Sequence, residues 1–173
     1  MSKVTLIFEE DEDYSTKFNS SEDMTDAITD VVLPEGLQFV GKNAFFHWKS
    51  LRNVHIPSSA TSIREGAFFG CSSLEEINIP EGVTSIGNAA FYGCSSLTSL
   101  HLPNSVESIG ISAFFGCSSL EEIYIPNVRI IRANAFIDCD SLKVIYIDKE
   151  KDSLDLSNTC IPETTVVKWR GEF

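Results

Sequence analysis

The sequence predicts a solenoid, in which short coils of similar length stack along one axis. Two observations predict it. Prolines recur every 23 residues from Pro34 to Pro126, with one residue deleted from the last copy, and an Ala-Phe pair recurs at a fixed place in each copy. A fixed period of this length is typical of repeat proteins, whose units bury their apolar side only against one another. A half repeat over 28–33 comes first, and full repeats begin at residues 34, 57, 80, 103 and 126.

Each repeat divides into a strand and a return segment. Before Pro126, the apolar residues Leu120, Ile123 and Ile125 alternate with polar or aromatic ones, which indicates a strand with one buried face. In the return segment 106–117 the apolar residues are spaced by three, four, one and three positions, which predicts a short helical or 3₁₀ arc. The phenylalanines that follow alanine are expected to stack in the core: Phe45, Phe68, Phe91, Phe114 and Phe136.

The two ends of the chain lack the repeat and are expected to cap it within one structural domain. Residues 1–27 contain a short apolar strand at 3–8 and the acidic run 9–13, and they predict an acidic N-terminal cap. Residues 148–173 predict a C-terminal cap with a strand at 165–169. Trp169 and Phe173 are expected to cover the open end of the core, because the last coil of a solenoid otherwise exposes its apolar side.

Four of the five cysteines share one repeat position, and Trp48 stands there in the first repeat. A position that accepts either residue requires an apolar filler, so we expect a ladder of reduced, buried thiols. A disulfide or a zinc site is the alternative, although the sequence has no C-x-x-C pair. The glycines just before three of these cysteines predict a tight turn with positive φ. The four cysteines are Cys71, Cys94, Cys117 and Cys139.

Composition excludes several kinds of partner. The formal net charge is −12, and residues 1–30 hold nine acidic residues against two lysines. Nucleic acid and anionic membranes bind clustered Lys and Arg, so neither is expected as a partner. No apolar run is long enough to enter a membrane, and the start at Met1 does not resemble a signal peptide. If Met1 is the native start, these observations predict a cytoplasmic protein; secretion or cell-surface display is the alternative.

The repeat also resembles a known family. The pattern Ile-Gly-x-x-Ala-Phe-x-x-Cys-x-x-Leu-x-x-Ile-x-Ile-Pro, seen at 109–126 and with Leu at the strand positions at 86–103, is similar to the leucine-rich repeats of the BspA-like, or Treponema pallidum, type. The resemblance covers 28–147. It implies a right-handed arc with a parallel β-sheet on the concave face and short helical or 3₁₀ segments on the convex face. It also implies an adhesion or interaction module without a catalytic centre.

The residues themselves favour no enzyme and no cofactor. The segment 36–43 imitates a phosphate-binding loop, but it ends in Asn43 where magnesium requires Ser or Thr. The paired serines after Cys71, Cys94 and Cys117 have no partnered His or Asp, which is typical of turn residues. His55 and His101 stand two coils apart, about 10 Å by strand spacing, which is too far to share a metal ion. No metal site is therefore expected.

The variable residues of the strands predict a binding surface, with a solvated sheet face as the alternative. We expect a non-catalytic module that binds a protein, which these residues suit because aromatic side chains lose little entropy on contact. The acidic residues among them favour a partner with basic residues. The predicted contacts are His55, Asn78, His101, Tyr124 and Tyr146, with Glu76 and Glu122 beside them.

Two further functions stay open. One is a cell-surface or secreted adhesin that binds host or matrix proteins. The other is a structural protein that associates with itself through its ends or through a stripe of large apolar residues. Half-burial of that stripe against neighbouring coils is the simpler interpretation, and it goes with a monomer. The stripe comprises Phe46, Phe69, Tyr92, Phe115 and Ile137.

Overall fold

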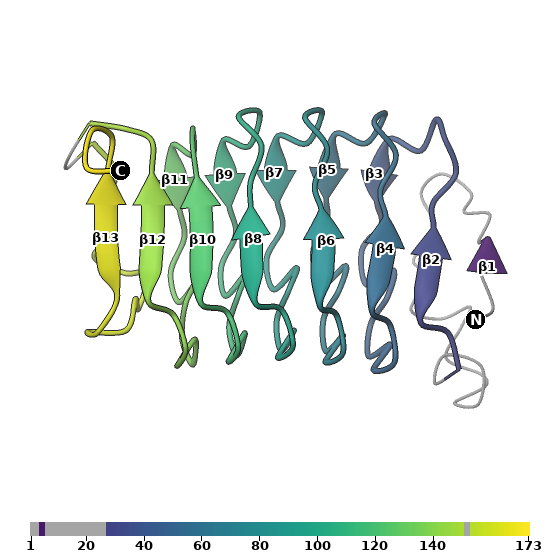
Figure 1. The fold of residues 1–173 in the computed structure, drawn as a ribbon. Coiled ribbons are helices and arrows are strands. Elements are labelled where there is room, and N and C mark those ends of the chain that lie inside the picture. Colours follow the sequence, from purple (N-terminus) through teal and green to yellow (C-terminus); the bar gives the residue numbers. More distant parts are fainter. Residues whose placement is uncertain (1–3, 6–26, 151–152) are drawn as a thin grey trace.

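The computed structural model describes residues 4–5, 27–150 and 153–173, and every regular element in these residues is a β-strand. The strands form two layers, one in front of the other, and each layer extends along the axis of the stack (Figure 1). The front strands are β1 (Val4–Thr5), β2 (Asp30–Val32), β4 (Asn53–His55), β6 (Glu76–Asn78), β8 (Ser99–His101), β10 (Glu122–Ile125), β12 (Val144–Ile147) and β13 (Val166–Trp169). The back strands are β3 (Phe39–Val40), β5 (Ser62–Ile63), β7 (Ser85–Ile86), β9 (Ser108–Ile109) and β11 (Ile130–Ile131).

Neighbouring strands pair in parallel, displaced by one repeat. Asn53 lies opposite Glu76 in the front layer, and Ser62 lies opposite Ser85 in the back layer. The shortened last copy changes the displacement, so that Glu122 lies opposite Val144. Each repeat thus adds one coil to the stack, which confirms the predicted solenoid. The strands predicted within 97–102 and 120–125 are β8 and β10, and they pair in parallel as expected.

The front layer consists of two hydrogen-bonded sheets. One has the strand order β1, β2, β4 and β6, and the other has the order β8, β10, β12 and β13. The strands β6 and β8 lie side by side (Figure 1), but they form no ladder in the part of the chain described. The back sheet is continuous from β3 to β11. Ile77 of β6 is only partly buried, whereas its counterpart Leu100 in β8 is 1% exposed.

The return segments are turns, so the predicted helical or 3₁₀ arcs are wrong for the described residues. Backbone N–H groups there alternate between two kinds of acceptor. The N–H of Phe45 donates to Ala67 O of the next coil (2.8 Å), whereas the N–H of Phe46 donates to Asn43 O three residues back (3.1 Å). A helix requires every N–H to bond within its own segment. Bonding between coils takes half of the donors, and the result is a series of tight turns.

Two residues in each coil hold these turns in the left-handed region of φ. The glycines predicted to have positive φ do so, with Gly93 and Gly116 both at 69°. His47 (60°) and Asp138 (56°) adopt the same conformation in the first and last repeats. At Gly70 space is also limiting, because a Cβ atom there would lie 2.5 Å from the His47 ring. Positive φ therefore favours glycine at this position, and the nearby His47 ring leaves no room for a Cβ atom.

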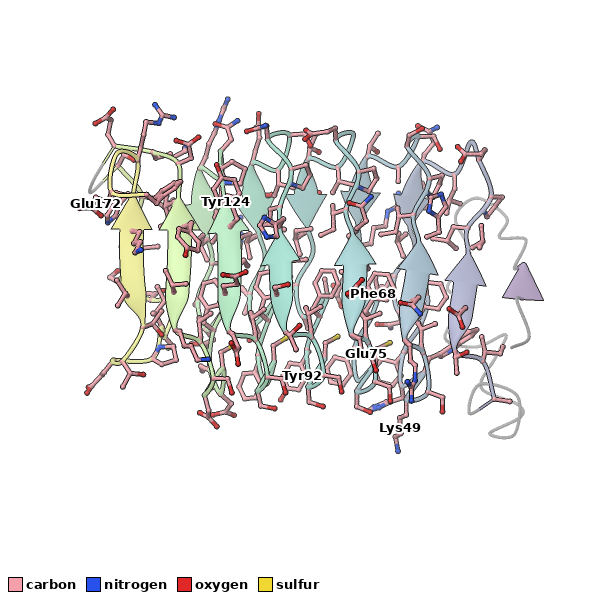
Figure 2. The ribbon with its side chains drawn as sticks, in the orientation of Figure 1. Lys49, Phe68, Glu75, Tyr92, Tyr124 and Glu172 are labelled. Atoms are coloured by element: carbon pink, nitrogen blue, oxygen red, sulfur yellow. The ribbon has the colours of Figure 1, made fainter. Side chains whose placement is uncertain are left out.

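The phenylalanine ladder lies between the two layers and forms the centre of the core. All five rings are fully buried, and Figure 2 shows Phe68 inside the stack. Successive ring centroids are 5.2, 5.3, 5.6 and 5.7 Å apart, with planes within 15° of parallel. Leucine, isoleucine and valine of the strands surround the rings. This confirms the predicted core.

The cysteines at the shared position are free and fully buried, as predicted. Each thiol donates a hydrogen bond to the carbonyl oxygen of a core phenylalanine in the preceding coil. For example, Cys94 Sγ lies 3.2 Å from Phe68 O, and Cys117 Sγ lies 3.1 Å from Phe91 O. Burial raises the pKa of all four thiols, to about 12 for Cys139. The thiols therefore behave as small, protonated core side chains.

The C-terminal coil closes the front layer. The strand predicted at 165–169 is β13, and Trp169 (7% exposed) pairs with Ile147 and joins the core. Phe173 does not cover the end of the core as expected; it is 53% exposed and turns towards the front face. At the other end, β1 pairs with β2. The rest of the predicted acidic cap, residues 1–27, lies outside the described residues except for Ala27.

Candidate functional site

The front face carries the predicted contact residues, because side chains alternate along each strand. In β10, Ile123 and Ile125 are buried, while Glu122 and Tyr124 point outwards and are half-buried. The same alternation exposes His55, Asn78 and His101 in the shorter strands. Parallel pairing at a displacement of one repeat then aligns these side chains in a column, which continues past Tyr146 to Lys168 of β13. We call the residues at 32, 55, 78, 101, 124, 146 and 168 the front column.

The structure divides the front column into two groups. His55 pairs with Asn78 between β4 and β6, and Glu76 lies on the same strand as Asn78. His101 pairs with Tyr124, and Tyr124 pairs with Tyr146, between β8 and β12. The two groups meet where β6 and β8 lack a ladder in the described part of the chain. The predicted residues therefore share one face but do not belong to a single hydrogen-bonded sheet.

The second group forms an aromatic surface. The His101 and Tyr124 rings are stacked, with centroids 5.9 Å apart. Phe173 lies edge-on to both tyrosines, with its centroid 5.3 Å from that of Tyr146 and 6.1 Å from that of Tyr124. Lys168 Nζ lies 5.5 Å from the centre of the Tyr146 ring, within the range of a cation–π contact. We call His101, Tyr124 and Tyr146 the aromatic site (Tyr124 is labelled in Figure 2).

A polar contact lies behind the aromatic site. Tyr124 donates its hydroxyl hydrogen to Asp148 Oδ2 at 3.5 Å, and Asp148 also pairs with Arg170. Partial desolvation raises the pKa of Tyr124, and the Asp148 carboxylate raises it further. The phenol therefore stays protonated and available as a donor at neutral pH.

Most charged side chains on the strand entrances neutralise one another between coils. Arg52 pairs with Glu75 (3.4 Å), and Lys143 pairs with Glu121 (2.8 Å). Glu76, Glu122 and Lys168 of the front face have no ion pair among the described residues. The two carboxylates are therefore not neutralised by a neighbouring coil, in contrast to Glu75 and Glu121.

Four residues beside the aromatic site were not predicted as functional from the sequence: Lys168, Asp148, Arg170 and Phe173. A signal existed for the first three. Lys168 follows Tyr146 by the 22 residues of the last repeat, and Asp148 precedes Arg170 by the same interval. The other ion pairs between coils also span one repeat, which is 23 residues in Lys42–Glu65 and 22 residues in Glu107–Arg129. Phe173 lies beyond the repeats, so no period indicates its contacts.

The competing stripe lies on the turns at the lower edge of Figure 2, where Tyr92 is labelled. Its aromatic rings stack coil on coil, with centroids 4.9 Å apart for Phe46–Phe69 and 4.5 Å apart for Tyr92–Phe115. The stripe is half-buried along most of its length, and only Phe46 reaches 38% exposure. The expected half-burial against neighbouring coils is thus confirmed.

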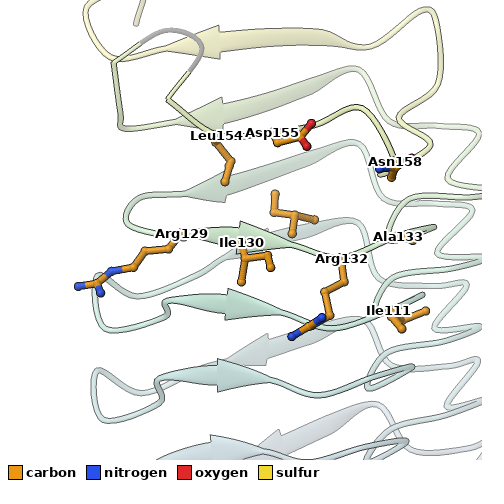
Figure 3. A pocket seen from close by; sticks show the side chains of 9 residues that line it. Ile111, Arg129, Ile130, Arg132, Ala133, Leu154, Asp155 and Asn158 are labelled. Carbon is orange, nitrogen blue, oxygen red and sulfur yellow. The ribbon is translucent and has the colours of Figure 1, made fainter.

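A pocket of about 480 Å³ opens on the back face beside β11 (Figure 3). Ile130 (44% exposed), Arg132, Leu154 and Asp155 lie around it. It forms where the back sheet ends and the chain passes into the last coil. A shallower hollow of about 440 Å³ lies over β2 and β4 and includes His55. Neither was predicted from the sequence.

The described residues include few candidates for metal binding or nucleophilic catalysis. They include no group of three or more His, Cys, Asp or Glu side chains that could hold a metal ion. The buried cysteines are protonated and inaccessible, which makes them poor nucleophiles. A search of the described residues for helices long and apolar enough to cross a membrane finds none.

The stacked parallel coils and the variable front column define a β-solenoid of the leucine-rich-repeat class. The family model for the BspA-type leucine-rich repeat region matches residues 18–154 in six copies, and the chain belongs to this family. The predicted resemblance is therefore confirmed. A search of curated proteins found no match.

Solved structures agree with this assignment. The leucine-rich repeat protein of T. pallidum is 32% identical, with a TM-score of 0.70, and the match covers 82% of this chain and 69% of that one. A leucine-rich repeat protein from Bacteroides ovatus is 31% identical with a TM-score of 0.64, over 83% of this chain and 42% of that one. The pneumococcal vaccine antigen PcpA is 26% identical with a TM-score of 0.74, over 82% of this chain and 36% of that one. Leucine-rich repeats of this family are generally non-catalytic.

Proposed function

We propose that the chain is a non-catalytic protein-binding module that contacts its partner through the front face. The observation that carries this proposal is the aromatic site, three adjacent ring-bearing side chains on a regular parallel sheet. Core positions repeat the same residue types in every coil, whereas the front column changes from Val32 to Lys168. Rigid aromatic side chains on a fixed scaffold are typical of residues that dominate the binding energy of protein interfaces.

The charge of the face indicates the kind of partner. Glu76 and Glu122 flank the front column and have no ion pair in the described structure. A partner with Lys or Arg opposite them gains attraction and faster association, and a strongly acidic partner is repelled. The module is therefore proposed to bind a protein with a basic surface around an exposed apolar residue.

The proposal is tested by capture of partners on the immobilised chain, followed by binding measurements with each purified partner. The variant Tyr124→Ala plus Tyr146→Ala is expected to weaken binding by at least about tenfold, because central aromatic residues of interfaces typically cost about 2 kcal/mol or more when truncated. Tyr92→Ala makes one such truncation in the stripe, on the turns, and serves as the control. Equal binding by the double variant and the wild type refutes the front-face proposal. Loss of binding with Tyr92→Ala alone identifies the stripe as the interface.

A second candidate is an adhesin at the cell surface. It is supported by the similarity to PcpA, which is described as a vaccine antigen, although this chain spans only 36% of that protein. Antibody staining of intact and permeabilised cells that express the chain distinguishes the two cases. Staining of intact cells favours the adhesin, and staining only after permeabilisation favours an internal binding module.

A further inference from the structure

Residues 169–173 reverse the direction of the chain at the end of β13. The N–H of Glu172 donates to Trp169 O at 2.9 Å, and the N–H of Trp169 donates to Glu172 Oε2 at 2.8 Å. Gly171 allows this tight turn because its φ is 88°, a backbone angle that residues other than glycine rarely adopt. The turn directs Phe173 back over the front face.

The Phe173 ring lies on the two tyrosines of the aromatic site. It meets both edge-on, with interplanar angles of 74° to Tyr146 and 88° to Tyr124. This arrangement places the positive edge of one ring against the negative face of another, the favourable geometry for aromatic pairs. The two tyrosines belong to adjacent coils, so one ring from the last coil spans both. The aromatic site is therefore already occupied by a ring of the same chain.

The residue Arg170, before the turn, is held by hydrogen bonds, whereas the Phe173 ring is held by aromatic contacts. Arg170 donates two hydrogen bonds to Asp148, to Oδ1 and to the backbone carbonyl, each 2.6 Å long, and Asp148 also accepts from Tyr124. Beyond Gly171, the ring contacts of Phe173 are with Tyr124 and Tyr146, and 53% of its surface is exposed. Rotation at Phe173 itself can lift the ring while the two Trp169–Glu172 hydrogen bonds and the Arg170–Asp148 pair stay intact. The occupied and open states thus differ by few contacts.

We propose that Phe173 occupies a subsite for an aromatic side chain of the partner, and that the partner's ring displaces it on binding. This inference rests on the proposed function and specifies one feature of the partner, an exposed Phe, Tyr or Trp. The partner binds only molecules in which the site is open, so its apparent affinity is reduced by the open fraction. Phe173 therefore competes with the partner's ring for the same site and lowers the apparent affinity of the chain for the partner.

The test uses the full 173-residue chain and its Phe173→Ala variant. The probe is the peptide acetyl-Arg-Gly-Glu-Phe-amide, which copies residues 170–173. Tyrosine ring signals are followed by NMR, and Tyr92 provides an internal control far from the site. In the variant without peptide, the Tyr124 and Tyr146 signals shift and the Tyr92 signal does not. The peptide binds the variant at least about tenfold more tightly than the wild type, as expected for a site that is open about a tenth of the time.

Three results overturn the proposal: unshifted Tyr124 and Tyr146 signals in the variant, equal affinity of the peptide for both proteins, or no binding to the variant at millimolar peptide. A peptide with Leu in place of Phe is the matched control, and equal binding by this peptide refutes an aromatic subsite. The outcome is separable from that of the proposed function. If partner binding is lost in the Tyr124→Ala plus Tyr146→Ala variant but unchanged in Phe173→Ala, the front face binds the partner and the competitor role fails.

Discussion

The ring of Phe91 lies parallel to the ring of Phe114, with centroids 5.6 Å apart and planes 13° apart, and both side chains are fully buried. Each ring thereby packs between the rings of the preceding and following coils. Because every coil contacts only its neighbours, this stacking couples the stability of each repeat to the next.

Phe91→Ala is expected to lower the free energy of unfolding by about 3–5 kcal/mol, the usual cost of removing a buried phenylalanine and leaving a cavity. Phe46→Ala removes the same atoms from the stripe, where the ring is 38% exposed, and should cost about 1 kcal/mol. Urea unfolding followed by circular dichroism measures both. Equal losses would show that the inner ladder is not the centre of the core.

The buried thiols should resist alkylation in the folded protein. Iodoacetamide reacts with the exposed Cys160 in the native state, whereas Cys71, Cys94, Cys117 and Cys139 react only after unfolding. Mass spectrometry should therefore find one modified thiol in the native protein and five in guanidinium chloride. Native modification of any cysteine in the ladder would contradict the packing described.

The same burial predicts loss of stability at alkaline pH. Burial raises the pKa of the Cys117 thiol, so the folded protein keeps this proton while the unfolded chain releases it above about pH 8.5. The unfolded state then binds fewer protons, and the free energy of unfolding falls as pH rises, by up to about 1.4 kcal/mol per pH unit for each thiol. Cys117→Ala should reduce this slope by one proton.

Leu120→Ala is the control for that experiment, because it creates a cavity in the same coil without removing a thiol. It should lower stability at every pH and leave the slope between pH 8.5 and 10 unchanged. Denaturant titrations at several pH values measure both slopes. An unchanged slope in Cys117→Ala would mean that this thiol does not stay protonated in the folded protein.

Close backbone contact between coils predicts a strong effect of one small substitution. A Cβ atom on Gly110 would lie 2.5 Å from the backbone of Asn88 and Gly87 in the coil before it. Gly110→Ala should therefore force the coils apart and cost about 1–3 kcal/mol, as overpacking typically does. Arg132→Ala, at the equivalent position of the next coil, keeps its existing Cβ and should change the melting temperature little. Similar melting temperatures for Gly110→Ala and the wild type would contradict this contact.

The parts of the fold that repeat could be predicted from the sequence, because a residue type that recurs at the same position in five copies shows whether that position is buried or exposed. The period, the strand positions and the burial of Phe114 and Cys117 follow from residue type and spacing alone. The return arcs were misjudged because the apolar spacing of residues 106–117 fits a helical turn as well as it fits successive tight turns. What decides between them is the hydrogen bonding between coils, such as Phe45 N–H to Ala67 O, and a single repeat contains no sign of it.

The candidate site could be predicted only in part, for a related reason. Alternation along β10 places Tyr124 outside, and the repeat register places Tyr146 beside it. Extending the front column by one more coil in the same register also places Lys168 beside Tyr146. The contact of Phe173 with both tyrosines depends on a single turn at Gly171, outside the repeats, and three-dimensional coordinates are needed to find it.

The front face, and not the back face, is proposed to contact the partner. Site-specific photo-crosslinking distinguishes the two faces, with a photoreactive phenylalanine analogue placed at His101 of β8 in the front layer or at Ser108 of β9 in the back layer. We predict a covalent adduct with the partner from position 101 and none from position 108. An adduct from position 108 without one from position 101 would contradict it.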